Sequence, residues 1–422
     1  MASIGAVGYL VRQTLVAALT ANALRPSRSF RGGALSFLAG FLTVELAPQI
    51  LAANSVDTAV HLLRRRRSWP GLALAAFSTA GLAREIALSR SSPQGLNTAV
   101  GTLGELEGLE PIAARDAERT LARRVNPLPR RDPRVRVVRD VRYSPAGRRG
   151  LLDLYLPTDP PASHAPVLLQ VHGGGWTIGA KENQGVPLMQ HMASLGWVCV
   201  AINYRLAPRA PFPAQIIDVK RAIAWIKEHV AEYGGDPDYV VVTGGSAGGH
   251  LASLAALTPN APEFQPGFED ADTSVQAAAP IYGVYDFAGA TGLRSAIAMR
   301  DRFLGPRVLL RSYDAEPELF EAGSPILRIN DCAPDFFVVH GAADSLVDVG
   351  QARLFVEALK RRSRAHVVYA ELPGAQHAFD LFNTTRTSHM VRALANYLTW
   401  HRRRHVAGPD SVPDEPLGTM AQ

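Results

Sequence analysis

Hydrophobic residues follow two different patterns along this chain. In the N-terminal quarter, long apolar stretches occupy residues 4–24, 34–51 and 69–88. After about residue 136, short apolar runs such as residues 167–171 and 239–242 alternate with helical patterns. Short apolar strands that alternate with helices are typical of a buried parallel sheet. The pattern therefore predicts an α/β domain that follows an apolar helical region.

The chain has 422 residues, which is long for a single domain, and its composition changes along its length. We expect an apolar helical region over residues 1–110 and a connector over residues 111–135. The α/β domain should occupy residues 136–406, with a cap inserted at about residues 286–324, before a polar, Pro-rich tail over residues 407–422. The insertion carries apolar side chains that would shape an acyl pocket or pack in the core, namely Phe287, Leu304, Leu309, Leu310, Tyr313 and Phe320.

The apolar N-terminal stretches allow three interpretations. Each contains at least one charge, such as Arg12 or Glu45, so none is a clean membrane span. Residues 1–90 could form marginal spans or helices lying on a membrane, with the arginine run at residues 64–67 among lipid headgroups. They could instead form a soluble helical cap over a site, or a cleaved export segment. A membrane-associated protein, otherwise cytoplasmic, is the leading expectation.

The most informative chemical signal is the Gly-Gly-Ser-Ala-Gly sequence of residues 244–248. It follows the apolar run at residues 239–242 and precedes a helical pattern at residues 250–257. A G-x-S-x-G motif between a strand and a helix holds its serine on a sharp turn at a helix N-terminus. Ser246 is therefore predicted to be a nucleophile, and the free N–H groups of the helix N-terminus are predicted to favour an oxyanion.

A second glycine motif supports this interpretation. The sequence His-Gly-Gly-Gly-Trp at residues 172–176 directly follows a strand-like run. Three glycines after a buried strand expose consecutive backbone N–H groups, as an oxyanion hole requires. We therefore expect oxyanion donors at Gly173, Gly174 and Gly175.

A serine nucleophile needs a base to take its proton, and the base needs an acid to orient it. In α/β-hydrolases these residues follow the order serine, acid, histidine along the chain. Asp344 and His377 each lie on a loop after a strand-like run, in that order. They are the predicted acid and base, with Asp348 and Asp335 as alternatives for the acid.

The choice of histidine rests on context, because the chain contains 12. Only His377 combines a loop position with the required order. His250 lies one turn beyond Ser246 on the same helix, where it should pack or line the substrate pocket. His172, Trp176 and Gly245 are further candidates for the pocket.

Taken together, these motifs resemble the hormone-sensitive-lipase-like branch of the α/β-hydrolases, from about residue 136 to about residue 402. The resemblance implies a mostly parallel eight-stranded sheet flanked by helices, a cap over the site, and ester hydrolysis through an acyl-enzyme. Ser246 would be the nucleophile, His377 the base and Asp344 its orienter, with no cofactor. The oxyanion donors would be the N–H groups of Gly174, Gly175 and Ala247. The matching motifs, in chain order, are residues 172–176, 204–208, 211–214, 234–237, 244–249, 340–347 and 377–379.

Two positions depart from that family. Gly245 stands where the family often has an acid, and Arg209-Ala210 stands where it often has Glu-His. The motif around Ser246 is also similar to formamidase-like and peptidase-like relatives. The leading prediction is a carboxylesterase or lipase-like enzyme for short to medium acyl esters, including lipid esters. An amidase or formamidase with the same triad is the alternative, and an inactive hydrolase fold used as a binding or membrane module is a third.

Charge and cysteine content narrow the range of partners. The net charge is +6, but the arginine runs are short and lack interleaved aromatic residues, so no nucleic-acid partner is expected. Cys199 and Cys332 have no metal-ligand spacing, so no metal site is expected. The sequence leaves the oligomeric state open.

Overall fold

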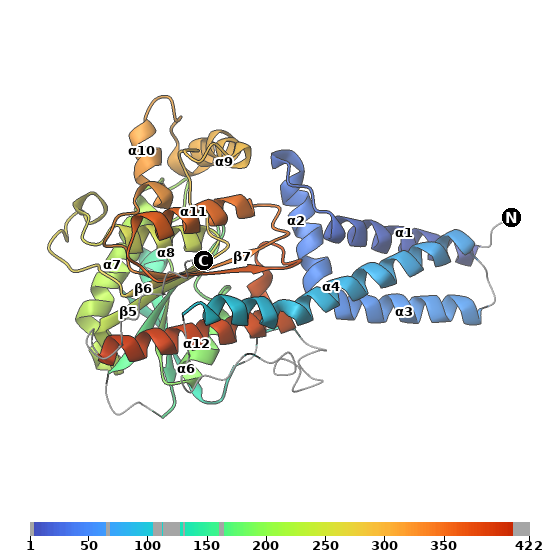
Figure 1. Cartoon of the computed structure of the whole chain (residues 1–422), viewed down its shortest axis with the longest axis horizontal. Coiled ribbons are helices and arrows are strands. Elements are labelled where there is room, and N and C mark those ends of the chain that lie inside the picture. The colour runs from blue at the N-terminus through green and yellow to red at the C-terminus, as the bar shows by residue number, and fades with distance from the viewer. Residues whose placement is uncertain are drawn as a thin grey trace, which may run out of the picture.

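The computed structural model describes residues 4–64, 68–103, 112, 127–129, 131–159 and 164–407. Most of the expected connector, and the expected tail beyond residue 407, lie outside the described residues. Figure 1 shows two parts, an α/β domain and a helical arm that projects from it.

The described strands form one eight-stranded sheet. The strands are β1 (Val135–Arg142), β2 (Leu151–Pro157), β3 (Ala165–Val171), β4 (Val198–Ile202), β5 (Gly235–Gly245), β6 (Ala277–Ile281), β7 (Asp335–Gly341) and β8 (Val367–Leu372). Their order across the sheet is β1-β2-β4-β3-β5-β6-β7-β8. β2 pairs antiparallel with both β1 and β4, and the remaining pairs are parallel. The predicted α/β-hydrolase fold is confirmed.

The composition of the strands matches their places in the sheet. β4 and β6, in the parallel part, are buried throughout and consist mainly of Val, Ala and Ile. β1 lies at the edge and keeps several side chains exposed. The register between β3 and β5 pairs Val171 with Gly244, so both glycine motifs leave the sheet side by side. The parallel register thus positions the site.

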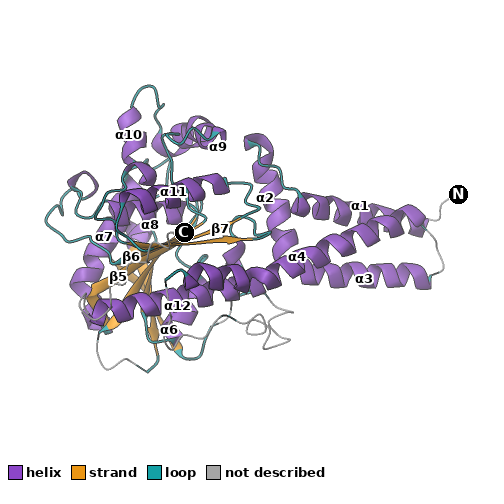
Figure 2. Ribbon diagram, in the orientation of Figure 1, coloured by secondary structure: helices purple, strands orange, loops and turns teal. Residues whose placement is uncertain are grey.

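Helices cover both faces of the sheet, as Figure 2 shows. The helices of the α/β domain are α6 (Val186–Ser194), α7 (Ala214–His229), α8 (Ala247–Leu257), α11 (Val349–Arg362) and α12 (Thr385–Ala407). α7, α8 and α11 contribute to one apolar core cluster. α6 and α12 contribute to a second cluster, together with the last turns of an N-terminal helix.

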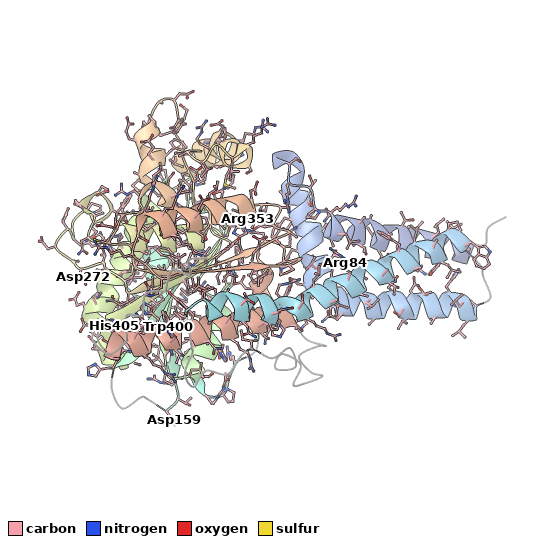
Figure 3. All side chains as sticks on the ribbon, viewed as in Figure 1. Arg84, Asp159, Asp272, Arg353, Trp400 and His405 are labelled. Atoms are coloured by element: carbon pink, nitrogen blue, oxygen red, sulfur yellow. The ribbon has the colours of Figure 1, made fainter. Side chains whose placement is uncertain are left out.

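The N-terminal region is helical, as predicted. Its helices are α1 (Ile4–Leu24), α2 (Phe30–Glu45), α3 (Ala47–Leu63) and α4 (Trp69–Gly101). α1, α3 and the first half of α4 lie side by side and project from the domain, while α2 crosses their base. The second half of α4 runs onto the α/β domain, and Arg84 lies on α4 between these halves (Figure 3).

The insertion between β6 and β7 contains α9 (Arg294–Met299), a π-helical segment (Arg300–Leu309) and α10 (Pro317–Ala322). Most of its large apolar residues face the domain core instead of a pocket. The buried members are Phe287, Leu304, Leu309 and Phe320. Core packing, one of the two roles expected for these residues, is therefore what the structure shows for them.

Candidate active site

The turn between β5 and α8 holds Ser246 in an unusual backbone conformation, with φ 59° and ψ −121°. A positive φ is uncommon for a residue other than glycine. Small neighbours make the turn possible, because a Cβ on Gly248 would collide with the carbonyl oxygen of Val171. A Cβ on Gly245 would lie 2.6 Å from Tyr282 Oη. This strained turn presents the serine hydroxyl above the carboxyl end of the sheet.

Three side chains from three separate loops meet at this turn. His377, between β8 and α12, places its Nε2 2.8 Å from the Oγ of Ser246. Its Nδ1 lies 2.6 Å from the Oδ2 of Asp344, which follows β7. The structure therefore brings together the serine, the histidine and the acid that the motifs singled out.

Asp344 is fully buried, and all its oxygen contacts favour the ionised form. Its Oδ1 accepts hydrogen bonds from the N–H groups of Leu346 (2.8 Å) and Val347 (2.9 Å), and its Oδ2 lies 3.2 Å from the Nε2 of His340. Burial raises the pKa of this carboxyl, but the histidines outweigh burial and hold the pKa of Asp344 well below its usual range. Asp344 is a carboxylate at neutral pH.

The alternative acids have other partners. Asp348 caps α11 by accepting the N–H of Gly350 at 2.9 Å, and it also accepts the hydroxyl of Ser295. Asp335 accepts the N–H of His366 at 2.8 Å. His340 is a residue that sequence reasoning missed. Its pattern predicts only the buried end of a strand, and nothing in that pattern indicates contact with Asp344.

The glycine loop after β3 offers free backbone donors. Gly174 and Gly175 have φ values of 115° and 56°, and their N–H groups bond to no protein acceptor in the described structure. Ala247 is the first residue of α8, so its N–H has no acceptor within the helix. Gly173 differs, because its N–H already donates to Oε1 of Gln184. The structure therefore removes Gly173 from the predicted donors.

A cavity of about 620 Å³ opens beside Ser246 and His377. Oxyanion-loop residues form one wall, the insertion forms a second, and the start of α2 forms a third. Its lining comprises Arg28, Ser29, Gly33, Ala34, Gly175, Trp176, Ser246, Val284, Arg294, Ser295, Ala298, Met299, Phe303, Ser345, Leu346, Val347, Asp348 and His377. Of the four predicted pocket residues, Trp176 is in this lining.

The other three predicted pocket residues lie behind the cavity wall. His250 accepts the indole N–H of Trp176 at 3.2 Å and donates to the carbonyl of Gly323 at 2.7 Å, and burial lowers its pKa to about 3. His172 is buried with its Nδ1 2.7 Å from its neighbour's carbonyl oxygen, and burial lowers its pKa to about 4. Gly245 packs against Tyr282. These three residues therefore support the site structurally and do not line the substrate pocket.

The contribution of α2 was not predicted residue by residue. Gly33 and Ala34 line the cavity, and the ring of Phe37 meets the ring of His377 edge-on at 5.7 Å. The backbone carbonyl of Gly33 also accepts the hydroxyl of Ser345. The expectation of a helical cap over the site thus describes α2, whereas α1 and α3 extend away from it.

Among the described residues, no group of three or more potential ligands is arranged to hold a metal ion. Cys199 is buried and Cys332 exposed, and both are free. Burial raises the pKa of the Cys199 thiol.

Similarity to known proteins extends over most of the chain. A family model named BD-FAE matches residues 152–359. The Mycobacterium tuberculosis protein named "Probable carboxylic ester hydrolase LipM" is 44% identical over 96% of both chains. Esterase LipQ of the same organism is 52% identical over 61% of both chains.

Two solved structures show the same architecture. Esterase Est2 of Thermogutta terrifontis with butyrate bound has a TM-score of 0.51 at 26% identity, covering 67% of this chain and 97% of that one. A carbohydrate esterase from gut microbiota, at 23% identity and a TM-score of 0.55, shares the fold and covers 65% of this chain and 99% of that one. The chain has the serine turn of this fold and is similar to LipM over nearly its full length. It therefore belongs to the α/β-hydrolase family of carboxylic ester hydrolases.

Proposed function

We propose that this ester hydrolase works through a covalent acyl-enzyme on Ser246, with His377 as general base and Asp344 as its orienting acid. The observation that carries the proposal is the unbroken chain of contacts from Ser246 Oγ through the imidazole to the Asp344 carboxylate, at 2.8 and 2.6 Å. This chain gives the hydroxyl an acceptor for its proton and fixes the tautomer of the imidazole.

In the first step, Oγ of Ser246 attacks the ester carbonyl carbon while its proton passes to Nε2 of His377. The tetrahedral intermediate then collapses, the bond to the alcohol oxygen breaks, and that oxygen takes the proton from Nε2. Water repeats the sequence on the acyl-enzyme and releases the carboxylic acid. Asp344 stabilises the imidazolium that forms in each half-reaction.

The oxyanion would be held by the N–H groups of Gly174, Gly175 and Ala247. These donors are fixed by the backbone before substrate binds, so little reorganisation is needed during the reaction. Each such donor typically contributes about 10²–10³ in rate.

The cavity favours an acyl group of short to medium length. Its volume of about 620 Å³ is bounded by apolar side chains such as Val284, Met299 and Phe303. The similar esterase Est2 holds butyrate in its solved structure, which agrees with a modest acyl pocket.

The test is hydrolysis of p-nitrophenyl esters from acetate to palmitate by the wild type and by Ser246→Ala. We expect the variant to lose about 10⁴-fold or more in kcat, because the remaining groups cannot form the acyl-enzyme. Ser253→Ala is the matched control. It removes a hydroxyl from the same helix whose one hydrogen bond within the described residues is to the carbonyl of Gly249, so it should keep near wild-type activity.

Equal activity in the wild type and Ser246→Ala would disprove the acyl-enzyme proposal. If the wild type instead cleaved formamides or anilides faster than every ester, the triad would stand but its substrate class would be the amide alternative.

A further inference from the structure

The projecting part of the N-terminal region, made of α1, α3 and residues 69–84 of α4, is called the arm here. Its burial pattern is the reverse of that in a water-soluble bundle. The residues that α3 buries are small or polar, namely Ala47, Asn54 and His61. Between the helices, α1 and α4 bury Gln13, Ala17, Thr20, Gly71, Ala75, Ser78 and Gly81, with Tyr9 and Leu82 as large members.

Large apolar side chains point outward from all three helices. On α1, Val11 and Leu15 are 64% and 62% exposed, and on α3, Val56 and Leu63 are 65% and 81% exposed. The full set on the arm is Val7, Val11, Leu15, Val56, Val60, Leu62, Leu63, Trp69 and Phe77. Small and polar residues between helices with large apolar residues outside are typical of helices packed in lipid.

Glycines set the close packing of the arm. A Cβ on Gly71 would lie 2.8 Å from the ring of Tyr9, and one on Gly81 would collide with Thr20. Helices that associate within a bilayer gain little from apolar burial, so they rely on such close contacts.

Charged residues are also distributed along the chain as expected for a segment that contacts anionic lipid. The first 103 residues contain ten arginines, no lysine and only three carboxylates, whereas residues 104–422 contain 34 basic and 35 acidic side chains. The whole excess of positive charge therefore belongs to the N-terminal region. Arg64 ends α3 at the far tip of the arm, and it is followed in the sequence by three more arginines at residues 65–67. Such a cluster suits anionic lipid headgroups.

One of these three carboxylates lies along the side of the arm, and basic and polar partners neutralise its charge. Asp57 of α3 accepts hydrogen bonds from Arg12 at 2.7 and 3.2 Å and from Gln13 at 3.1 Å. The other two carboxylates lie at its base, where Glu45 and Glu85 are buried. Ionisable groups within membranes pair with one another in this way.

The dimensions fit a membrane. α1 has 21 residues and α3 has 17, which correspond to lengths of roughly 31 and 25 Å at 1.5 Å per residue. The hydrocarbon core of a bilayer is about 30 Å thick. Among the described helices, α4 is long and apolar enough to cross a membrane by itself, with a mean hydropathy of 1.3 in its best window.

We propose that the arm inserts into a lipid bilayer that contains anionic lipids, and that α2 lies at the bilayer surface. α2 and α3 meet at a bend of 78°, so an arm along the membrane normal places α2 nearly in the membrane plane. Leu35, Leu38 and Leu42 then face the lipid from one side of α2, and they are 73%, 58% and 46% exposed. The opposite side of α2 contacts the catalytic cavity.

A bilayer accounts for the exposed residues better than a second copy of the chain. A dimer interface covers one continuous face, whereas the exposed apolar residues of the arm lie on three helices and at the tip. A second copy would also bring another excess of arginines against the first, which repels instead of attracts.

The test compares full-length chains for flotation with vesicles of phosphatidylcholine containing one quarter phosphatidylglycerol. The wild type should float, and it should stay with membranes from expressing cells after high-salt and alkaline washes. The triple variant Val11→Glu, Leu15→Glu, Val56→Glu changes only residues that water already reaches, so it should fold and remain in the soluble fraction. The control triple Leu195→Glu, Leu327→Glu, Val406→Glu changes exposed apolar residues of the α/β domain and should float like the wild type.

Hydrolysis of p-nitrophenyl butyrate and thermal unfolding by circular dichroism report whether each variant is folded. The proposal is overturned if the wild type stays soluble without detergent, if high salt alone releases it, or if the arm variant floats equally well. A soluble wild-type dimer that the arm variant converts to a monomer would assign the surface to a second copy instead. Flotation does not depend on ester hydrolysis, so these outcomes are separate from a failure of the catalytic proposal.

The geometry extends to the substrate, and this step rests on the proposed function. The cavity lining includes Arg28, Ser29, Gly33 and Ala34, at the N-terminal end of α2, which the proposed orientation places at the bilayer surface. Esters embedded in the bilayer can therefore reach Ser246 without crossing water. We expect the arm variant to keep its rate on soluble butyrate esters but to lose at least about tenfold on an acylglycerol presented in vesicles. An equal loss on both substrates would show a damaged site and contradict this step.

Discussion

At the scale of single residues, the proposed role of Asp344 depends on its contact with His377, and a single substitution can test that contact. Asp344→Asn keeps the size of the side chain but places an amide opposite Nδ1 of His377. The imidazole then favours the wrong tautomer for accepting the proton of Ser246. We expect kcat to fall by about 10⁴-fold with a small change in KM, measured with p-nitrophenyl butyrate.

Asp335→Asn serves as the control for this change. Asp335 binds His366 at the start of β7, far along the strand from the catalytic loop, so its variant should keep wild-type kinetics. A fall in kcat of less than tenfold in Asp344→Asn would mean that another group orients His377.

The site residues could be predicted from the sequence where a local motif or the order of residues along the chain identifies them. Ser246 follows from a G-x-S-x-G motif between a strand and a helix, and His377 and Asp344 follow from chain order. For His250 the sequence left packing and pocket lining open, and for His172 it predicted pocket lining, because a histidine behind the wall and one in the wall have the same sequence context. His250 is fixed by Trp176 and Gly323, which lie 74 and 73 positions away in the chain.

At the scale of elements, α2 is fastened to the α/β domain by a buried ion pair. Glu45, the last residue of α2, bonds Nη1 of Arg386 on α12 and accepts the hydroxyl of Thr384 at 2.8 Å. Both charged side chains are 1% exposed. Removal of one member of such a pair leaves the other charge buried without compensation.

Glu45→Gln should therefore lower the free energy of unfolding by about 3–5 kcal/mol and reduce esterase activity, since α2 also forms a cavity wall. Thermal or urea unfolding of the full chain measures the first effect. Glu357→Gln, which removes a carboxylate from an exposed pair with Arg361, is the control and should change stability by less than about 1 kcal/mol. The double variant Glu45→Gln, Arg386→Met should be less destabilised than the sum of its single changes, and strict additivity would contradict a direct pairing.

Strands and helices were easier to predict than their contacts. Apolar runs with glycine motifs after them specify β3 and β5 locally. In contrast, the apolar pattern of the first hundred residues predicts helices but not which helix meets the domain. That choice depends on long-range pairs such as Glu45 with Arg386 and Phe41 with Phe382. A sequence pattern contains no information on such partners.

At the scale of the whole molecule, the two parts differ in what their interiors contain. The α/β domain buries apolar residues on both faces of its sheet, and its surface charge is nearly balanced. The arm buries small and polar residues and concentrates the positive charge. Hydrophobicity alone could not separate a cap from a membrane anchor, because both need apolar helices. The observation that favours the proposed membrane anchor is which face of each helix is buried.

The interior of the α/β domain also determines its response to acid. Burial lowers the pKa of His172 to about 4, of His250 to about 3 and of His401 to about 4, from an ordinary value of 6.5. In the unfolded chain these histidines bind protons below about pH 6.5, whereas the folded chain keeps them neutral. The unfolded state therefore binds more protons, and stability falls as the pH is lowered from 6.5. At pH 5 each histidine should cost about 2 kcal/mol relative to pH 8.

Urea unfolding of the full chain between pH 8 and pH 5 measures this loss of stability. The variant His401→Phe isolates the contribution of one of the three histidines. His401 packs its ring among Tyr239, Tyr397 and Trp400, so phenylalanine fills the same space without a titrating group. The variant loses the hydrogen bond to Tyr239 at every pH, which lowers its stability by a constant amount. Its stability should nevertheless fall less steeply below pH 6.5, by about 2 kcal/mol at pH 5. A parallel pH dependence in the variant and the wild type would mean that His401 takes up its proton at the same pH in the folded protein as in the unfolded chain, and that acid acts on stability through other groups.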